Sequence, residues 1–333
     1  MLSVETAQAI NAVIQPPEGT QEVVKITDLL AEAYPEITLN KEIGKGAFSK
    51  VFSFSYLSSE GNRAQAAFKM VNFWTATKEE NHRCFKVTNE QIGGEWFSLL
   101  DLGPHVLKTF RVLYFDHKIL QFKLMNSEEF QELFANSKSE QNLNLTLVGA
   151  ISEYFPEAIT LNQCNSFTSA QIQKYAREIL LGLQAIHNVQ KDNLQLIHRD
   201  IKPRNILITP DGIKLLDLGL ARFIEKSHKR RYSSCGTLPN MAPEVLQKAE
   251  YDISADFYSV ATVLFYMATK RHVCRAKDKQ DYLLYHLREP RLITNPALAY
   301  INPKLKDLID KLGHPYSENR ITAEEARAHL FFQ

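Results

Sequence analysis

The stretch His198-Arg199-Asp200-Ile201-Lys202-Pro203-Arg204-Asn205 decides how the rest of this 333-residue sequence is interpreted. Asp200 can accept or orient the proton of a hydroxyl nucleophile, and Lys202 can neutralise a phosphoryl group during its transfer. Asn205 offers a neutral oxygen ligand of the kind that Mg²⁺ accepts. A polar loop between two helices is the alternative, but eight residues of these types in this order argue against it.

A second acidic motif, Leu215-Leu216-Asp217-Leu218-Gly219, follows downstream. A carboxylate at the end of an apolar strand, followed by glycine, suits a metal site, because Mg²⁺ usually takes one or two protein carboxylates and completes its shell with phosphate and water. A simple Asp-x-Gly turn after a strand is the alternative.

Two glycines near the start of the β-rich region are a weaker signal. Gly44 and Gly46 would let a hairpin backbone approach a phosphate without Cβ collisions. Ser49 stands where a third glycine would complete G-x-G-x-x-G, and hairpins use glycine for ordinary turns as well. The pattern therefore leaves both interpretations open.

Lys69 lies inside an apolar strand pattern. Because a buried ammonium is costly, it needs a partner unless its side chain reaches water at the sheet edge. Glu95 and Glu90 lie on the helical pattern that follows, and Glu95 is the better placed of the two. Farther on, Glu244 of Ala242-Pro243-Glu244 and Arg320 are candidates for a buried ion pair, which we predict to be structural.

Composition limits the classes of protein that this chain can represent. At about 150 residues per domain, the length suggests two domains or lobes. Lys+Arg is 39 and Asp+Glu is 38, so the net charge of +1 argues against a nucleic-acid coat or a polybasic membrane binder.

The apolar run Val260–Thr269 is shorter than the roughly 20 residues of a membrane span. No basic residue precedes Lys25, so we expect no secretory signal. The four cysteines are scattered without a CxxC pair, which favours a reduced protein without structural zinc.

The pattern of apolar residues changes along the chain from β-rich to helical. We expect strands at 51–56, 66–73, 106–115, 118–125 and 145–155. We expect one helix within 90–102, another capped by Ser169, and further helices at 254–269, 278–288, 303–312 and 322–330. Thr322 and Glu325 form the pattern of a capping box.

In order and spacing, these motifs resemble the signature set of eukaryotic-type serine/threonine protein kinases. The resemblance covers about residues 38–332. It implies an α+β, bilobal protein kinase-like fold with a small β-rich N-lobe and a larger α-helical C-lobe. We therefore expect an N-terminal helical extension at 1–36, an N-lobe at 37–152 with an insertion at about 126–144, and the hinge and C-lobe at 153–333.

The resemblance also implies a role for each motif. The catalytic residues would be Asp200, Lys202, Lys69, Glu95 and Thr237. The residues around ATP would be Ile43, Gly44, Lys45, Gly46, Ala47, Phe48, Ser49, Val51, Ala67, Lys69, Glu153, Phe155 and Leu207. Asn205 and Asp217 would hold Mg²⁺, and Asp256 would brace the catalytic loop. Ser152 would stand at the gatekeeper position before the hinge Glu153-Tyr154-Phe155.

The implied activity is transfer of the γ-phosphoryl of Mg-ATP to protein hydroxyls. Lys202 and Thr237 resemble the serine/threonine subclass. The alternative is a pseudokinase-like scaffold that binds nucleotide or partners without turnover, although no catalytic position is lost. A small-molecule kinase of related architecture is a third reading, against which Ala242-Pro243-Glu244, Arg320 and the full activation segment argue.

The activation segment would run from Asp217 to Glu244, and we predict autophosphorylation there, at Ser233 or Ser234. Further candidates are Ser227 and Tyr232. The basic run His228-Lys229-Arg230-Arg231 could recruit acidic substrates or could be a solvated charged face.

Expected partners are proteins carrying Ser or Thr, with no nucleic acid and no integral membrane association; dimerisation cannot be read from the sequence. We expect a cytoplasmic protein. The divergent sequence, the N-terminal extension and the insertion resemble the eukaryotic-like effector kinases that intracellular bacteria such as Legionella deliver into host cells, although a divergent eukaryotic kinase would look similar.

Overall fold

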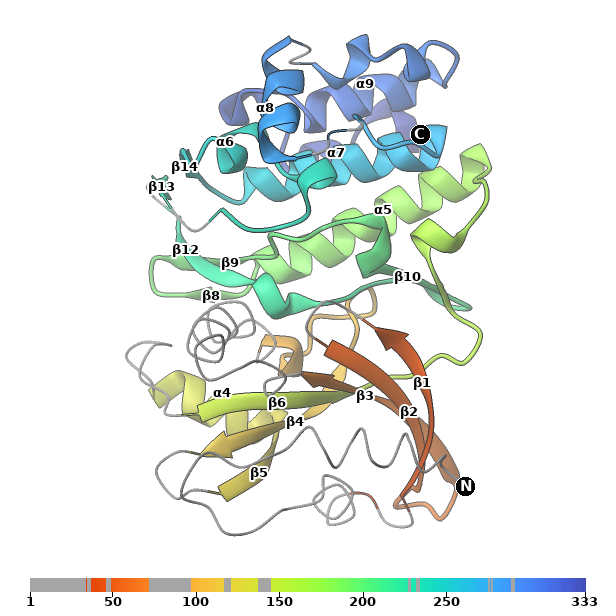
Figure 1. Cartoon of the computed structure of the whole chain (residues 1–333), viewed down its shortest axis with the longest axis vertical. Helices are drawn as coiled ribbons and strands as arrows, with labels where there is room; N and C mark the ends of the chain where they lie inside the picture. Colours follow the sequence, from red (N-terminus) through yellow and green to blue (C-terminus); the bar gives the residue numbers. More distant parts are fainter. Residues whose placement is uncertain are drawn as a thin grey trace. The chain divides into compact units, whose positions relative to one another are not determined.

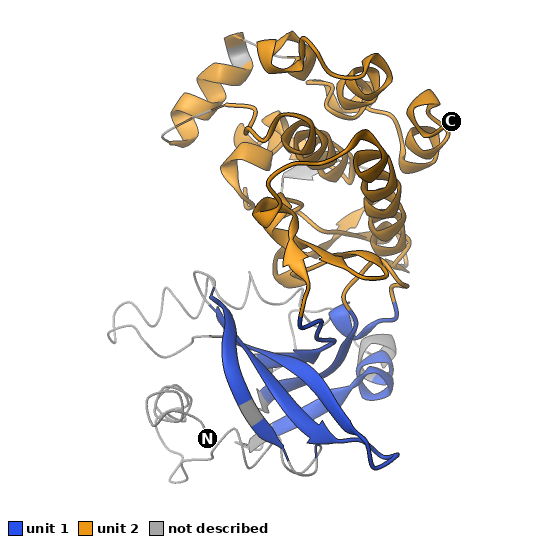
Figure 2. Ribbon diagram, turned by 90° about the vertical axis from the view of Figure 1, so that its right-hand side faces the viewer, with its two compact units in different colours: residues 1–101, 108–156 blue, residues 102–107, 157–333 orange. Residues whose placement is uncertain are grey.

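The structure is a computed structural model that describes residues 34, 37–45, 49–71, 97–116, 121–136, 145–226, 229–231, 234–274, 276, 278–288 and 291–333. The chain forms two compact units, which Figure 2 shows in separate colours. The first comprises Met1–Asp101 and Lys108–Pro156, and the second comprises Leu102–Leu107 and Glu157–Gln333. This division falls between Pro156 and Glu157, a little after the expected lobe boundary at 152/153, and it places residues 102–107 with the second unit.

The described strands of the first unit form one antiparallel sheet in the order β1-β2-β3-β6-β4-β5 (Figure 1). Their bounds are Thr38–Lys45 (β1), Ser49–Leu57 (β2), Arg63–Val71 (β3), Thr109–Asp116 (β4), Gln121–Asn126 (β5) and Leu145–Ser152 (β6). The five predicted strands are thereby confirmed, with shifted ends.

The central residues of β2 are buried on both faces of the sheet. Phe52 and Phe54 are almost completely buried, but Ser53 and Ser55 are buried too, so β2 is not the half-buried strand that the period-two pattern predicts. Tyr34 is also buried and packs edge-on against Phe54 and Tyr56, with ring centroids 5.4 and 4.8 Å apart. Otherwise, almost all of the predicted N-terminal extension lies outside the described residues.

A helix that the sequence analysis did not predict lies in the stretch interpreted as an insertion. This helix, α4, spans Ser127–Asn136. The Glu129 amide donates to Asn126 Oδ1 at 2.9 Å, and the Asn126 amide donates to Glu129 Oε2 at 2.8 Å, which is a reciprocal capping box. Phe130 anchors the helix, because it is buried and its ring lies 6.2 Å from that of Phe97. The polar composition of the stretch conceals this short apolar face.

The second unit is mainly helical. Its described α-helices are Ser169–His187 (α5), Pro243–Leu246 (α6), Ser254–Thr269 (α7), Lys279–Arg288 (α8), Pro303–Leu312 (α9) and Ala323–Arg327 (α10). Its 3-10 turns are Leu161–Gln163 (η3), Pro203–Asn205 (η4), Leu218–Leu220 (η5), Leu238–Asn240 (η6), Leu292–Thr294 (η7), Pro296–Leu298 (η8), Ser317–Asn319 (η9) and Leu330–Phe332 (η10).

Short strands complete this unit. The sheet β11-β10-β7 contains Gly212–Leu215, Ile206–Thr209 and Ile159–Thr160, and the sheet β12-β9-β8 contains Arg222–Glu225, Leu194–Ile197 and Gln190–Lys191. A two-stranded ladder pairs β13 (Arg230–Arg231) with β14 (Glu250–Tyr251). The β9–β12 and β10–β11 pairs carry the loops that hold the candidate site.

Helix α7 is the centre of the second unit and packs against α5 and α9 (Figure 1). It is apolar around most of its circumference, and almost all of its side chains are buried, as such a helix requires. The predictions for 254–269 and 303–312 match α7 and α9, and the Thr322–Glu325 capping box is confirmed. The predicted cap of α5 is wrong by one residue, because Thr168 is the cap and Ser169 is the first helical residue.

None of the helices within the described ranges is both long enough and apolar enough to span a bilayer.

Candidate active site

The catalytic-loop motif lies between β9 and β10, and its side chains converge on the carboxylate of Asp200. Lys202 Nζ donates to Asp200 Oδ2 at 2.6 Å, and Thr237 Oγ1 donates to Asp200 Oδ1 at 2.8 Å. Asn205 Nδ2 donates to the same carboxylate at 3.1 Å and to the Asp200 carbonyl at 3.0 Å. The carboxylate is therefore held in one orientation by three side chains.

Thr237 joins this network from the activation segment. Its hydroxyl accepts a hydrogen bond from Lys202 Nζ at 2.8 Å and donates its own proton to Asp200. Gly236, just before it, has φ of +112°, and a Cβ there would lie 2.7 Å from the Arg199 carbonyl oxygen. Only glycine fits this close approach, so the activation segment meets the catalytic loop through a residue that cannot be substituted without movement.

His198 links the catalytic loop to the strand that precedes Asp217. Its Nδ1 accepts the Asp200 amide at 3.2 Å, which requires the proton to be on Nε2, and Nε2 donates to the Leu216 carbonyl at 3.1 Å. The Leu216 amide in turn donates to the Asn205 carbonyl at 2.9 Å. Both candidate metal ligands, Asn205 and Asp217, are therefore placed by one backbone junction.

Asp217 itself adopts a left-handed backbone conformation with φ of +64°. Its Oδ1 caps the following turn η5 by accepting the Gly219 amide at 3.4 Å. In the described residues, His, Cys, Asp and Glu form no group of three that could hold a metal ion by themselves. A carboxylate and an amide oxygen are the protein ligands that this junction offers.

Asp256 of α7 holds the backbone of the catalytic loop by hydrogen bonds. Its carboxylate accepts the amides of His198 and Arg199, each at 2.9 Å, and the Nε2 of His187 at 2.8 Å. Burial acts to raise the pKa of Asp256, but the hydrogen bonds from the His187 side chain and the His198 amide hold that pKa below its ordinary value. His187 was missed by the sequence analysis; its place at the end of the buried face of α5 is the only sequence signal for it.

Arg199 is held in an unfavourable conformation by this brace. Its φ is +69°, which costs a non-glycine residue on the order of 1 kcal/mol or more. Its Nε donates to the Leu220 carbonyl at 2.6 Å, and its Nη1 lies 3.4 Å from the hydroxyl of Tyr251. The Arg199 side chain thus connects the catalytic loop with η5 and β14.

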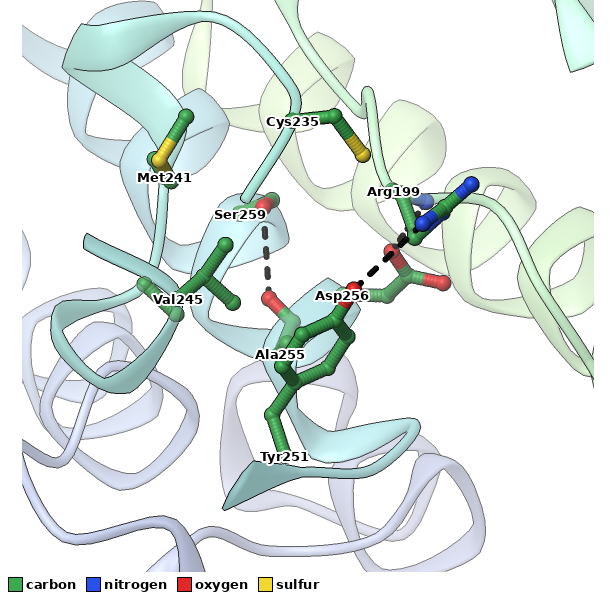
Figure 3. A pocket seen from close by; sticks show the side chains of 9 residues that line it. Arg199, Cys235, Met241, Val245, Tyr251, Ala255, Asp256 and Ser259 are labelled. Atoms are coloured by element: carbon green, nitrogen blue, oxygen red, sulfur yellow. Dashed lines mark hydrogen bonds between the residues drawn. The ribbon is translucent and has the colours of Figure 1, made fainter. Parts of the chain in front are cut away.

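A cavity of about 20 Å³, enough for one water molecule, lies between the activation segment and α7 (Figure 3). Its lining includes Arg199, Cys235, Tyr251, Asp256 and Ser259. It is too small for a nucleotide or a peptide side chain, and we assign it no part in the chemistry.

The predicted ion pair between Glu244 and Arg320 is confirmed. Arg320 donates two hydrogen bonds to the carboxylate, at 2.6 and 2.8 Å, and its side chain is completely inaccessible to solvent. The same guanidinium donates to the carbonyls of His314 and Ser254. The pair joins α6 to the turn after α9 and stabilises the end of the activation segment.

The predicted nucleotide residues of the first unit lie on three adjacent strands. Val51 of β2 pairs with Lys69 of β3, which pairs on its other side with Ala150 of β6. Ala67 is buried and pairs with Ser152. Lys69 is half-buried, as its apolar strand predicts. Gly44 pairs with Val51, and Gly46, Ala47, Phe48, Glu90 and Glu95 lie outside the described residues.

The remaining predicted site residues are divided between the two units. In the first unit, Ile43 and Lys45 lie on β1 and Ser49 begins β2. The Glu153 amide donates to the Lys108 carbonyl at 3.0 Å, and Phe155 is half-buried two residues later. Leu207 lies in the second unit, on β10, paired with Thr160 and Lys214.

The family model described as the protein kinase domain matches residues 37–332. The chain belongs to the protein kinase family. The α+β fold expected from the resemblance, with a β-sheet N-terminal region and a helical C-terminal region, is thereby confirmed.

Several ribosomal protein S6 kinases are relatives of this kinase-family chain. Ribosomal protein S6 kinase alpha-3 of Mus musculus is 26% identical over 330 residues, which cover 96% of this chain and 39% of that protein. The putative ribosomal protein S6 kinase alpha-1 of Caenorhabditis elegans is 32% identical over 172 residues, covering 50% of this chain and 21% of the relative. The human alpha-1 protein is also 32% identical, with 22% covered. The chain thus spans well under half the length of these curated relatives.

Proposed function

We propose that this chain is a serine/threonine protein kinase that transfers the γ-phosphoryl group of Mg-ATP to protein hydroxyls. The observation that carries the proposal is the network in which Lys202, Thr237 and Asn205 hold the Asp200 carboxylate. The membership of the protein kinase family and the similarity to S6 kinases support the proposal.

Asp200 is the residue that would receive the acceptor hydroxyl. Its carboxylate can accept a hydrogen bond from that hydroxyl and take its proton as the new oxygen–phosphorus bond forms and the bond between the γ-phosphorus and ADP breaks. Lys202 lies 2.6 Å from Asp200, so its ammonium would stand beside the phosphoryl group and offset its charge. Thr237 holds both groups through its hydroxyl, and this residue is one of the two that resemble the serine/threonine subclass.

The residues at the junction of β11 and the catalytic loop fit Mg²⁺. Asn205 uses its amide nitrogen on Asp200, which turns its oxygen away as a neutral acceptor, and Asp217 provides a carboxylate directly after the buried strand. When bound, Mg²⁺ would neutralise phosphate charge. The assignment of Asn205 and Asp217 as its ligands is part of the proposal.

Binding of ATP is assigned to the residues named from the resemblance. Lys69 would contact the α and β phosphates, and Glu95 would pair with Lys69. The positions of Val51 and Ala67 on the strands beside Lys69 support this assignment, because side chains at alternate positions share one face of a sheet.

The proposal is tested with the purified full-length chain, Mg-ATP and a mixture of serine, threonine and tyrosine peptides. Asp200→Asn keeps the shape of the side chain and should lower phosphate transfer by at least 100-fold. Asp211→Asn, in the exposed turn between β10 and β11, is the matched control and should remain active. Equal activity of Asp200→Asn and the parent would refute the catalytic assignment, and nucleotide binding without any transfer would favour the pseudokinase-like scaffold.

Autophosphorylation of the activation segment at Ser233 or Ser234 is a further part of the proposal. Ser233 lies outside the described residues. The Ser234 hydroxyl donates to the Val245 carbonyl at 2.8 Å and accepts Lys279 Nζ at 2.8 Å. Phosphorylation of Ser234 would remove that donor but give Lys279 a dianionic partner. Mass spectrometry of the active protein would locate the phosphate, and an unmodified segment would contradict this part.

Protein substrates follow from the proposed activity, and a cytoplasmic location stays a prediction. Delivery as a bacterial effector stays a prediction, which detection of the chain inside host cells during infection would test.

A further inference from the structure

The catalytic loop presents an exposed arginine to solvent just before Asn205. In the turn η4, Pro203 and Asn205 are buried, whereas Arg204 is exposed. Asn205 Nδ2 lies 3.1 Å from the Asp200 carboxylate. Since consecutive Cα atoms are about 3.8 Å apart, the Arg204 Cα lies within about 10 Å of that carboxylate. Arg204 is therefore a neighbour of the group that would receive the substrate hydroxyl.

Two more cations follow the end of α7, close to the same turn. Lys270 Nζ donates to the Cys164 carbonyl, just after η3, and lies 4.3 Å from the ring centroid of Tyr266. Tyr266 also donates from its hydroxyl to the carbonyl of Asn162 within η3. Because η3 packs against η4, Lys270 is fixed beside the turn that carries Arg204. Arg271, the next residue, is exposed. We call Arg204, Lys270 and Arg271 the cationic patch.

The position of His272 supports the grouping. The pKa of its imidazole is lowered by desolvation and by the positive charge of Arg204. Arg204 therefore lies close enough to the segment 270–272 to act on its charge, and His272 itself adds no positive charge near neutral pH.

The cationic patch has no internal counter-charge in the described part of the chain. None of its three residues forms an ion pair with a described carboxylate, in contrast to Lys202 with Asp200. The basic run of the activation segment differs, because Lys229 donates to Ser317 at 2.7 Å and lies 3.7 Å from the Asp252 carboxylate. Arg204 and Arg271 are exposed, and Lys270 is half-buried. Cations that have no carboxylate partner and lie beside the reacting group create a positive potential that an anionic ligand would neutralise.

We propose that the cationic patch makes this chain select protein substrates with Asp or Glu close to the phosphorylated residue, with Arg204 as the main specificity-determining side chain. An extended peptide advances about 3.3 Å per residue, so a span of about 10 Å places the acidic side chain within about three residues of the acceptor hydroxyl. This inference rests on the proposed kinase activity and adds a substrate class to it.

The test uses the purified full-length chain and a set of serine peptides in which each flanking position is varied among Glu, Ala and Lys. The parent should phosphorylate the best Glu peptide with kcat/KM about 5- to 30-fold above the matching Lys peptide, and 0.5 M NaCl should reduce that ratio by screening. Arg204→Glu should reverse the preference. Lys304→Glu makes the same charge change on the exposed face of α9 and should leave the preference as in the parent.

The outcomes separate this inference from the proposed function. The proposed role of the cationic patch would be refuted by transfer to serine peptides without preference for Glu, or by a preference that Arg204→Glu leaves intact. Either result would leave the kinase assignment unaffected. Failure to phosphorylate any peptide would overturn both. If Arg204→Glu does not fold, Arg204→Gln should abolish most of the preference without reversing it, and an unchanged ratio in that folded variant would also refute the proposal.

Discussion

Thr237 connects Lys202 and Asp200 through a single hydroxyl group. Thr237→Val keeps the shape of the side chain but removes both hydrogen bonds. A hydrogen bond to a charged group contributes about 1.5–3 kcal/mol, and about 1.4 kcal/mol is a factor of ten. Because the direct bond between Lys202 and Asp200 remains, we expect a loss equivalent to about one such bond, so kcat on a serine peptide should fall about 10- to 100-fold. Thr237→Ser should retain most of the activity. A Thr237→Val variant with parental kcat and an unchanged melting temperature would show that Thr237 does not position these groups.

The Glu244–Arg320 pair lends itself to a stability measurement, because removal of one partner leaves the other charge buried. Arg320→Leu should lower the free energy of unfolding by about 3–5 kcal/mol. Arg291→Leu is the matched control, because its bidentate pair with Asp310 is partly exposed and should be worth about 1 kcal/mol or less. Urea unfolding of the two variants compares them directly. If both variants lose a similar free energy of unfolding, burial of the Glu244–Arg320 pair makes no additional contribution to stability.

How well individual residues could be predicted depended on how far apart their partners lie in the sequence. Asp200, Lys202 and Asn205 share one short loop, so their order alone indicates chemistry. Thr237 was found only through the resemblance. His187 contacts Asp256 across 69 positions, and no local pattern marks such a contact. The positive φ of Arg199 is likewise set by its tertiary hydrogen bonds rather than by residue type.

The same contrast governs whole helices and strands. Helix α7 was predicted to the residue because it is apolar throughout and must be buried. Helix α4 was missed, although Asn126 and Glu129 form a capping box, because only a narrow face around Phe130 is apolar. The ladder between β13 and β14 has two residues per strand, which is too short for period-two alternation to reveal.

Helix α8 carries a buried titratable group whose effect can be measured. His286 is surrounded by Tyr258 of α7 and by Tyr282 and Tyr285 of its own helix, and burial lowers its pKa from 6.5 to about 4. Between these two values the unfolded chain binds more protons than the native one, so stability falls as pH falls from about 6.5 to about 4. From pH 7.5 to 5.0, this one group should cost about 2 kcal/mol.

Chemical unfolding of the parent and of His286→Gln at those two pH values isolates this contribution. The variant should be less stable at pH 7.5 but should lose about 2 kcal/mol less than the parent on acidification. Asp256 does not interfere, because its pKa is lowered and its contribution is lost only below pH 4. Parallel pH profiles for the parent and the variant would show that His286 is not the group responsible.

For the protein as a whole, the division into two units followed from the change of pattern in the sequence, but the exact boundary did not. Residues 102–107 belong to the second unit because two backbone hydrogen bonds tie them to Leu215 of β11. The Leu107 amide donates to the Leu215 carbonyl at 2.9 Å, and the Leu215 amide donates to the His105 carbonyl at 2.8 Å. Such a contact joins segments more than 100 residues apart and leaves no mark on hydropathy. The change of pattern therefore predicts two units but does not assign residues 102–107 to the second of them.

Binding of Mg-ATP should stabilise the whole protein if the nucleotide assignments are right. A ligand that binds only the native state at 100 times its Kd adds about 2.7 kcal/mol to stability, which should raise the melting temperature by several degrees. Lys69→Met should remove most of this shift at the same ATP concentration, because the lysine is assigned to the phosphates. Lys41→Met, on exposed β1, is the matched control and should keep it. This measurement does not depend on turnover. A shift of the melting temperature that survives in Lys69→Met would therefore contradict the role of Lys69 even in an active enzyme. If ATP does not shift the melting temperature of the parent, ATP is not its ligand.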